Sequence, residues 1–254
     1  MMPNHTETAF DFESGAEKAR YVRLMFDGIA RRYDLMNRLM TLGRDQSWRR
    51  LAIRHAAVPA GGRVLDIAAG TGDLAIAALA ARPHKVVAAD FSLMMLKLAG
   101  QKFRQRGLDS QIVLAAADGM NLPFPDGHFD AVVTGFSLRN VASLDRFLSE
   151  MVRVTRPGGR VVCLEITRPR LPVFRRFFSW YFGRVVPRIG AWISGDSTAY
   201  SYLPHSVEIF VSPEELRERM NNAGMQHVGF ETLQFGTIAI HWGVKAKWSV
   251  RAME

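Results

Sequence analysis

Residues 64–73 constrain the fold of this chain more than any other part of its sequence. They read Val-Leu-Asp-Ile-Ala-Ala-Gly-Thr-Gly-Asp, an apolar run that meets an acidic residue and then a turn with two glycines. The Ala-rich stretch 74–81 follows, so the pattern predicts a strand, a turn and a helix, the opening unit of a doubly wound α/β sheet. Because Gly70 and Gly72 lack a Cβ, the turn can adopt positive φ and a ligand can approach its backbone closely.

Acidic residues around this turn indicate which ligand it binds. Asp90 ends the next apolar run, where a carboxylate can accept hydrogen bonds from ribose hydroxyls. A turn for a pyrophosphate would read Gly-x-Gly-x-x-Gly, whereas Asp73 would put a negative charge beside the phosphates. The pattern therefore favours a nucleoside that carries a cationic or zwitterionic group, and S-adenosylmethionine (SAM) fits. A purely structural glycine turn is the alternative, and Asp66, Asp73 and Asp90 together count against it.

The composition limits the classes of protein to consider. At 254 residues the chain has room for one α/β domain with additions, or for two small domains. The one cysteine, Cys163, excludes a disulfide framework within the chain and indicates a reducing compartment. No uncharged apolar run is long enough to span a bilayer, and the polar N-terminus lacks the apolar core of a signal peptide. We therefore expect a cytoplasmic protein.

Basic charge is concentrated in one part of the chain. The net charge is +9, and residues 151–195 contain nine arginines but one acidic residue, Glu165. Within 171–193 aromatic residues are interleaved with these arginines. Such a segment can contact nucleic acid, an anionic membrane surface or an anionic substrate. It can equally pack on the core or on a second copy of the chain.

The element pattern predicts a flexible N-terminus, residues 1–20, followed by one domain, residues 21–254. Residues 21–58 read as helices, with a break near 33–37, and form either a lid over the cofactor cleft or ordinary packing helices. From residue 63 onward strands alternate with helices, so we expect a mostly parallel sheet with ligands at the carboxyl ends of its strands. An insertion, residues 166–211, follows the fifth strand. The predicted strands are 63–67, 86–90, 112–116, 131–134 and 160–164 with an antiparallel hairpin from 228–233 and 237–245, and the predicted helices are 74–81, 92–106, 144–154 and one capped by Ser212.

Two later loops carry polar residues at the ends of predicted strands. Asp118 and Gly119 precede Leu-Pro-Phe at 122–124, which is the pattern of an adenine-contacting loop in many SAM methyltransferases. The alternative is an acidic residue in an ordinary β-turn. Arg139 and Asn140 follow the fourth strand, whose end lies beside the reactive group of the cofactor in such a sheet.

Arg139 therefore has two interpretations. A buried arginine beside the substrate could bind an anionic oxygen or lower the pKa of a phenol. It could instead be structural and pair with a carboxylate such as Glu165.

A set of short motifs runs along the chain, of which Leu-Arg-Asn-Val and Tyr-Asp-x-Met-Asn are more specific than the glycine turn. The motifs are Phe-x-x-Ile-Ala-x-x-Tyr-Asp-x-Met-Asn at 26–37, Trp48, Leu-Asp-x-Ala-x-Gly-Thr-Gly-Asp at 65–73, Leu-Pro-Phe at 122–124, Leu-Arg-Asn-Val at 138–141, Arg-Val-x-x-Pro-Gly-Gly at 153–159, Leu-Glu at 164–165, Pro-x-x-Gly at 187–190, Asp196, Tyr-Leu at 202–203 and Ile-His-x-Gly-x-Lys at 240–245. On these motifs the chain resembles the ubiquinone/menaquinone biosynthesis C-methyltransferases, a class I SAM-dependent family, over residues 22–247. The departures from the family pattern are Ala69, Gly135, Ser137 and residues 204–208, which lie mainly toward the acceptor.

The resemblance assigns roles to particular residues. It places SAM contacts on Thr71, Asp90, Asp118 and Gly119. It also implies that Arg139, Asn140 and Tyr33 line a quinol site and organise water for deprotonation. With the glycine turn and the strand ends included, the predicted cofactor site comprises Asp66, Gly70, Thr71, Gly72, Asp90, Asp118, Gly119 and Gly135.

The implied reaction is C-methylation of a polyprenyl hydroquinone ring in menaquinone and/or ubiquinone biosynthesis, without a metal. Arg139 would stabilise the phenolate, and Asn140 with Tyr33 would position a water or the hydroxyl. His241 is an alternative base, although its place in an apolar strand favours a structural role. We also consider methylation of another phenolic or lipid acceptor, and a non-catalytic SAM-binding component of a quinone-synthesis complex. A nucleic-acid methyltransferase is disfavoured because the chain lacks Asn-Pro-Pro-Tyr and a Pro-Cys nucleophile.

The implied partners follow from the substrate. A polyprenyl quinol resides in the membrane, so we expect peripheral contact with the inner face of the cytoplasmic membrane, with the basic aromatic segment at the headgroup interface. No nucleic-acid partner is expected, and a homodimer is one arrangement we consider.

Overall fold

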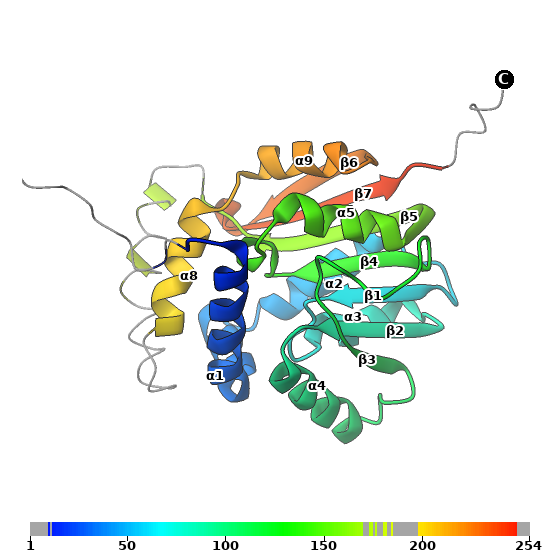
Figure 1. Cartoon of the computed structure of the whole chain (residues 1–254), viewed down its shortest axis with the longest axis horizontal. Coiled ribbons are helices and arrows are strands. Elements are labelled where there is room, and N and C mark those ends of the chain that lie inside the picture. The colour runs from blue at the N-terminus through cyan, green and yellow to red at the C-terminus, as the bar shows by residue number, and fades with distance from the viewer. Residues whose placement is uncertain are drawn as a thin grey trace, which may run out of the picture.

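A seven-stranded sheet forms the centre of the described structure (Figure 1). The computed structural model describes residues 10, 12–169, 173, 174, 176, 180, 181, 184 and 198–247. The strands lie in the order β3-β2-β1-β4-β5-β7-β6. Their bounds are β1 Arg63–Ile67, β2 Lys85–Asp90, β3 Ile112–Ala116, β4 Phe129–Gly135, β5 Thr155–Ile166, β6 Met225–Leu233 and β7 Ile238–Lys245.

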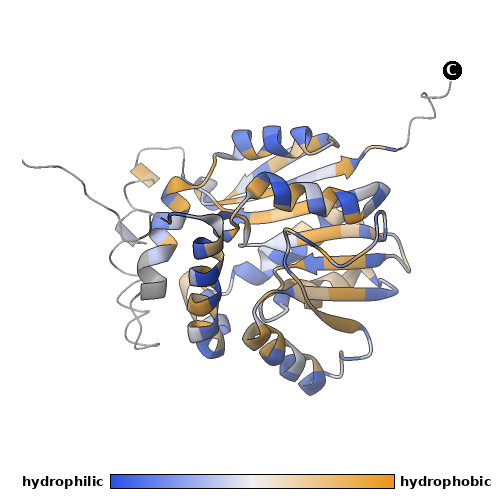
Figure 2. Ribbon diagram, in the orientation of Figure 1, coloured by the Kyte–Doolittle hydropathy of each residue, from blue (hydrophilic) through white to orange (hydrophobic). Residues whose placement is uncertain are grey.

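The sheet is parallel except at one edge. β1 pairs in parallel with β2 and β4, and β3 and β5 continue this direction on either side. β7 lies antiparallel between β5 and β6. This arrangement confirms the predicted doubly wound sheet with its antiparallel C-terminal hairpin. Figure 2 shows apolar residues concentrated along the strands, as expected where helices cover both faces of a parallel sheet.

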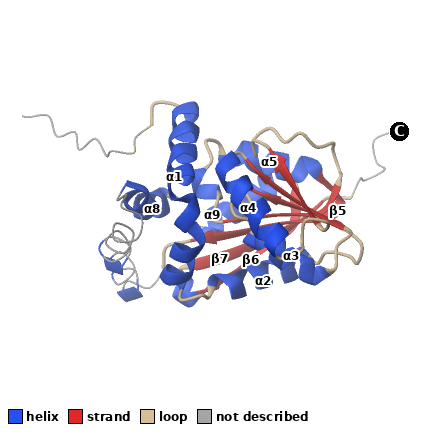
Figure 3. Ribbon diagram, turned by 90° about the horizontal axis from the view of Figure 1, so that it is seen from below, coloured by secondary structure: helices blue, strands red, loops and turns tan. Residues whose placement is uncertain are grey.

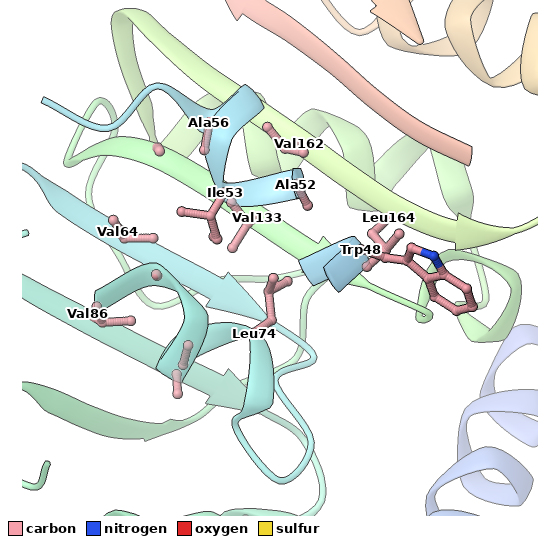
Figure 4. Packing of buried hydrophobic residues seen from close by; sticks show 14 of the residues in the cluster. Trp48, Ala52, Ile53, Ala56, Val64, Leu74, Val86, Val133, Val162 and Leu164 are labelled. Atoms are coloured by element: carbon pink, nitrogen blue, oxygen red, sulfur yellow. The ribbon is translucent and has the colours of Figure 1, made fainter. Parts of the chain in front are cut away.

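Helices pack on both faces of the sheet (Figure 3). On one face α2, α3 and α4 contribute to an apolar cluster in which Ile53 of α2 lies near Val133 of β4, and Trp48 of α2 lies near Leu164 of β5 (Figure 4). On the other face Phe147 of α5 lies in a second cluster, together with apolar residues of α9. The helices are α1 Gly15–Thr41, α2 Asp45–Ala56, α3 Asp73–Ala78, α4 Leu93–Gln105, α5 Leu144–Val154, α8 Thr198–Ile209 and α9 Pro213–Asn222, and the 3-10 turns are η1 Leu79–Ala81, η2 Leu138–Asn140 and η4 Gln234–Gly236.

Local sequence signals set several helix ends as predicted. Ser92 Oγ accepts a hydrogen bond from the backbone N of Met95 at 3.1 Å. Ser212 Oγ accepts one from the backbone N of Glu215 at 3.2 Å, and a proline opens that helix. These side chains satisfy amide groups that have no partner within the helix. The predicted helix over residues 144–154 has the same bounds in the structure.

The N-terminal helix starts earlier than predicted. Residues 1–20 were expected to be flexible, but α1 begins at Gly15. Its first turn is capped by Ser14, whose Oγ accepts from the backbone N of Glu17 at 3.2 Å. Ser-x-x-Glu is a capping signal that the mixed polar composition of this segment concealed.

The predicted break near residues 33–37 is wrong, because α1 is continuous through it. Ile29 and Met36 lie two helical turns apart, and both are buried, Met36 to 1% exposure. Their shared packing keeps one face of the helix against the protein across the supposed break.

The fifth strand and the insertion also differ in detail from the prediction. The turn predicted at 157–159 lies inside β5, where the pairing with β4 shifts register. A Cβ at Gly159 would lie 2.8 Å from the backbone O of Asp130, so this close pairing requires glycine. Within the insertion, residues 166–211, the structure places α8. Most of the aromatic and basic segment 171–193 lies outside the described residues, and the domain limits stay predictions.

No helix in the described parts of the chain is both long and apolar enough to cross a bilayer.

Gly72 illustrates how tightly the turn after β1 packs. Its φ is +83°, and a Cβ there would lie 2.3 Å from Cζ of Phe103 on α4. We expect Gly72→Ala to lower the free energy of unfolding by about 2–5 kcal/mol, from overpacking and left-handed strain. Gly28→Ala is the matched control, because nothing lies within 4 Å of its Cβ position in α1 and the change should stabilise the protein by about 0.5–1 kcal/mol. Urea denaturation measures both, and a Gly72→Ala protein as stable as the parent would contradict the packing argument.

Candidate functional site

Two adjoining cavities lie at the carboxyl ends of the parallel strands, where α1 crosses the end of the sheet (Figure 1). The first cavity has a volume of about 320 Å³. It lies between α1 and the loops that follow β1, β2, β3 and β4. Of the residues predicted to bind the cofactor, it is lined by Gly70, Asp90, Asp118, Gly119 and Gly135.

Asp90 joins the end of β2 to the glycine turn. One carboxylate oxygen accepts from the backbone N of Gly70 and the other from the backbone N of Ser92, each at 2.8 Å. Burial raises the pKa of Asp90 above its usual value, while these two backbone donors oppose the rise. Each carboxylate oxygen keeps a second lone pair, so the group can accept hydrogen bonds from a diol in the first cavity.

The turn is also tied to α1 by side chains. The Thr71 hydroxyl donates to Asp34 at 2.5 Å, and Lys102 lies 2.5 Å from Asp34 and 2.8 Å from Asp73. Burial works to raise the pKa of Asp73, but Lys102 outweighs it and holds that pKa below its usual value. Asp73 therefore faces an ammonium group of the protein. Thr71 lies outside the lining of both cavities.

The two remaining residues predicted to bind the cofactor, Asp66 and Gly72, lie inside the protein fold and outside the lining of both cavities. Asp66 is fully buried in β1, and burial raises its pKa to about 8, although Arg49 favours the charged form. Ala69, where the family usually has glycine, does not need a positive φ, whereas its neighbour Ala68 adopts φ +55°. The departure at Ala69 is thus compatible with the turn.

Asp66 should make stability depend on pH. The folded protein keeps the Asp66 proton up to about pH 8, whereas the unfolded chain loses it near its ordinary pKa of 3.8. This contribution is complete below the unfolded pKa and is lost as the pH rises through the folded pKa, by at most about 1.4 kcal/mol per pH unit. We expect Asp66→Asn to flatten the decline in unfolding free energy between about pH 5 and pH 8. Asp109→Asn, at an exposed position, is the control. Equal slopes for the parent and Asp66→Asn would contradict this.

The second cavity is larger, about 590 Å³, and mainly apolar. It lies between α1, the start of α2, α8 and the η4 turn. Its polar lining includes Arg139, Asn140 and Asp45. Its apolar and aromatic lining residues are Met25, Phe26, Ile29, Tyr33, Met36, Met40, Leu42, Trp48, Phe136, Ile166, Phe174, Tyr181, Tyr202, Leu203, Phe235 and Ile238.

Four residues line both cavities and form the junction between them. They are Phe26 and Tyr33 of α1, Phe136 after β4, and Asn140 of η2. The rings of Phe26 and Tyr33 meet edge to face, with centroids 5.9 Å apart. The two cavities therefore adjoin at these four residues.

Arg139 forms the predicted ion pair with Glu165, and its contact with substrate stays a prediction. It lines the second cavity, and its Nη1 contacts Glu165 Oε1 and donates to the backbone O of Phe136 at 2.9 Å. Glu165 is 1% exposed, so the ion pair is buried. The contacts with Glu165 and with the Phe136 carbonyl fix the orientation of the guanidinium.

Asn140 and Tyr33 place polar groups at the junction. Asn140 Nδ2 donates to the backbone O of Phe136 at 3.3 Å, which leaves the amide oxygen as an acceptor. Phe136 has φ +61°, and its carbonyl accepts from both Arg139 and Asn140. Burial raises the pKa of Tyr33, so its hydroxyl stays a neutral donor at neutral pH.

Sequence reasoning missed the polar start of α2. Asp45 lines the second cavity and is 1% exposed. Its carboxylate accepts from Thr41 at 3.2 Å and from Gln46 at 3.1 Å, and it lies 3.4 Å from Arg49 Nε. The Arg49 guanidinium lies 5.3 Å from the ring centroid of Phe136, so α2 also supports the junction. The sequence did not indicate that Asp45 is buried, because an acidic residue in the first turn of a helix is usually exposed.

His241 lies outside the lining of both cavities. It is 1% exposed and lies 2.9 Å from the backbone O of Pro213 through its Nε2. Burial lowers its pKa to about 4. This placement favours the structural role over that of a base.

Comparison with known proteins identifies relatives along most of the chain. The model of the ubiE/COQ5 methyltransferase family matches residues 14–245. The demethylmenaquinone methyltransferase of Thermus thermophilus is 47% identical over 220 residues, which cover 86% of this chain and 99% of the relative. The ubiquinone/menaquinone biosynthesis C-methyltransferase UbiE of Desulfotalea psychrophila is 44% identical over 225 residues, which cover 88% of this chain and 90% of the relative.

A solved structure supports the fold. The crystal structure of a SAM-dependent methyltransferase from Aquifex aeolicus superposes with a TM-score of 0.59 at 17% identity, covering 83% of this chain and 97% of the other. At that identity the likeness concerns the fold alone, the class I SAM methyltransferase fold. Taken with the family match and the two relatives, it means that this chain is a SAM-dependent enzyme and belongs to the ubiE/COQ5 methyltransferase family.

Proposed function

We propose that this protein transfers a methyl group from SAM to a ring carbon of a polyprenyl hydroquinone, in menaquinone and/or ubiquinone biosynthesis. The observation that carries the proposal is the junction, where the first cavity, lined by Asp90 and Asp118, adjoins the larger second cavity at Phe26, Tyr33, Phe136 and Asn140. Methyl transfer needs the donor and the carbon in line and in contact, and much of its rate comes from that positioning. The relatives' names describe methylation in quinone biosynthesis.

The first cavity suits SAM. Asp90 offers acceptors for ribose hydroxyls, and Gly70, at φ +56°, leaves the backbone accessible. Asp118 is exposed at the cavity, and its carboxylate accepts from the backbone N of Met120 at 2.9 Å, which holds it in place for an exocyclic amine. When bound, SAM supplies an electrophilic methyl group on a sulfonium.

The second cavity suits a prenylated ring. Its apolar walls match an isoprenoid chain. Asn140 and Tyr33 lie where the cavity adjoins the first one, and Arg139, next to Asn140 in the chain, also lines it. A ring there would place a hydroxyl beside the guanidinium and the amide. Arg139 would stabilise the developing phenolate, and Asn140 with Tyr33 would orient the hydroxyl or a water.

Asp45 is proposed as the acceptor of the hydroxyl proton, directly or through a water. Among the described residues that line the second cavity, it is the only carboxylate. Loss of the hydroxyl proton drives electron density to the ortho carbon, which would form the bond to the methyl group as the bond between that methyl group and the SAM sulfur breaks and S-adenosylhomocysteine leaves. The ring then loses the hydrogen from that carbon and regains a proton on oxygen, so that one proton is released overall.

The test is methyl transfer from labelled SAM to demethylmenaquinol and to its benzoquinol counterpart, each reduced and offered in detergent. Carbon-methylated product from either would support the proposal, and the ratio of products would identify the pathway. No transfer to either, with SAM bound normally, would favour another phenolic or lipid acceptor or a non-catalytic role.

The substrate also implies where the protein works. A polyprenyl quinol is dissolved in the bilayer, so we infer that the enzyme meets its substrate at the inner face of the cytoplasmic membrane. Homodimerisation stays a prediction without a specific structural observation to support it.

A further inference from the structure

The outward side of α1 carries exposed leucines in one stripe. Leu24 is 58% exposed, Leu35 52%, Leu39 44% and Leu42 86%. Separations of 11 and 4 residues bring Leu24, Leu35 and Leu39 to the same side of the helix, and Leu42 is the cap residue that follows its last turn. The opposite side already packs on the protein through Ile29 and other buried residues. The helix therefore has two apolar faces: one is buried against the protein, and the other, which carries the leucines, is exposed to solvent.

The same outward side is basic. Arg31 and Arg38 are exposed and fall within the leucine stripe by helical spacing. The acidic residues of α1 are engaged elsewhere: Glu17 caps the helix start, Asp27 accepts from Ser92 of the cofactor side, and Asp34 binds Thr71. The exposed stripe thus presents guanidinium groups and leucine side chains together. This is the composition of a helix face that lies in an anionic headgroup region.

The stripe ends at the opening of the second cavity. Leu42 and Phe235 are 86% and 69% exposed, and both also line that cavity. Phe235 stacks on Phe174 with ring centroids 4.3 Å apart. Arg44, next along the chain, is exposed and lines the same cavity. An apolar tail leaving the cavity here would emerge beside the leucine stripe.

We propose that this surface, the α1 outer face (Leu24, Arg31, Leu35, Arg38, Leu39 and Leu42) with Phe235 beside it, docks on an anionic lipid bilayer. It rests on the proposed function, because the bilayer is where a polyprenyl quinol is found. The leucines enter the headgroup boundary, the arginines bind lipid phosphates, and the cavity opens toward the acyl region. The substrate then enters the second cavity with its ring first and its tail still in the bilayer.

Vesicle binding by the full chain tests this inference. Flotation is compared between vesicles of phosphatidylcholine alone and vesicles with about 30% phosphatidylglycerol. We expect the parent to prefer the anionic vesicles, Arg31→Gln/Arg38→Gln to bind them about 10- to 30-fold less tightly, and Leu35→Gln/Leu39→Gln to bind both kinds less well. Leu93→Gln and Arg104→Gln, at exposed positions of α4, are the matched controls and should bind as the parent does.

A second measurement separates this inference from the proposed function. Turnover of a short-chain, water-soluble quinol should be unchanged in both double variants, because none of their four residues lines a cavity. Turnover of a long-chain quinol embedded in vesicles should fall with vesicle binding. Suppose that the parent methylates the soluble quinol. If the parent then binds no vesicle, or if neither double variant loses vesicle binding, the docking surface is wrong and the proposed function stands. No turnover of either quinol by the parent would count against the proposed function itself.

Discussion

Asp45→Asn is expected to lower turnover by about 10²–10⁴-fold, the usual contribution of a positioned general base. The substitution keeps the shape of the side chain but removes the carboxylate that we propose accepts the quinol proton. The affinity for SAM should be unchanged, because Asp45 lines only the second cavity. Turnover with a saturating reduced quinol and calorimetric SAM binding measure the two quantities.

A structural role for Asp45 would also reduce activity, so a further readout is needed. In Asp45→Ala, added acetate should restore part of the turnover if the missing function is proton transfer. Gln46→Ala is the control, because it removes one hydrogen bond to Asp45 and leaves the carboxylate in place. We expect it to keep more than a tenth of parental turnover. Full turnover by Asp45→Asn would exclude Asp45 as the base, and absence of acetate rescue would favour positioning.

Arg139→Ala should reduce both turnover and stability. Loss of the positive charge from the second cavity is expected to cost about 10²–10³-fold in turnover, as for other groups that stabilise a developing oxyanion. The substitution also leaves Glu165 buried and unpaired, which costs about 3–5 kcal/mol of unfolding free energy. Turnover, SAM affinity and urea denaturation measure these effects.

The double variant Arg139→Ala/Glu165→Gln separates the two effects. Without the unpaired carboxylate, much of the stability should return, while turnover stays low because the guanidinium is still missing. A catalytic contribution of Arg139 is contradicted if Arg139→Ala binds SAM normally and keeps full turnover. It is also contradicted if the double variant recovers turnover together with stability.

The cofactor side of the protein could be predicted from short sequence patterns. These patterns are the apolar runs, the glycine turn and the capping serines. Each depends on interactions between residues a few positions apart, so strand and helix positions can be predicted from them without the rest of the fold. Asp90 and Asp118 were placed correctly at the first cavity, because the ends of parallel strands necessarily meet at one edge of the sheet.

The same patterns were less informative where packing decides the outcome. Glycine in the turn was attributed to positive φ and to ligand approach. Gly70 and Gly72 do have positive φ, but the close neighbour of Gly72 is the ring of Phe103. The break expected within α1 is absent because Ile29 and Met36 hold the helix against the protein across that segment. Such contacts join residues on different elements, and the sequence around either partner does not reveal them.

The sequence by itself determined the fold class, the family and the use of SAM, since each depends on local patterns or on motifs shared with relatives. Only the tertiary structure decided how the acceptor side is built. It pairs Arg139 with Glu165, brings Asp45 of α2 to the second cavity and brings Tyr33 and Asn140 to the junction. These positions depend on how α1 and α2 pack over the sheet, because buried charges and apolar surfaces are satisfied only by partners that folding brings together from distant parts of the chain.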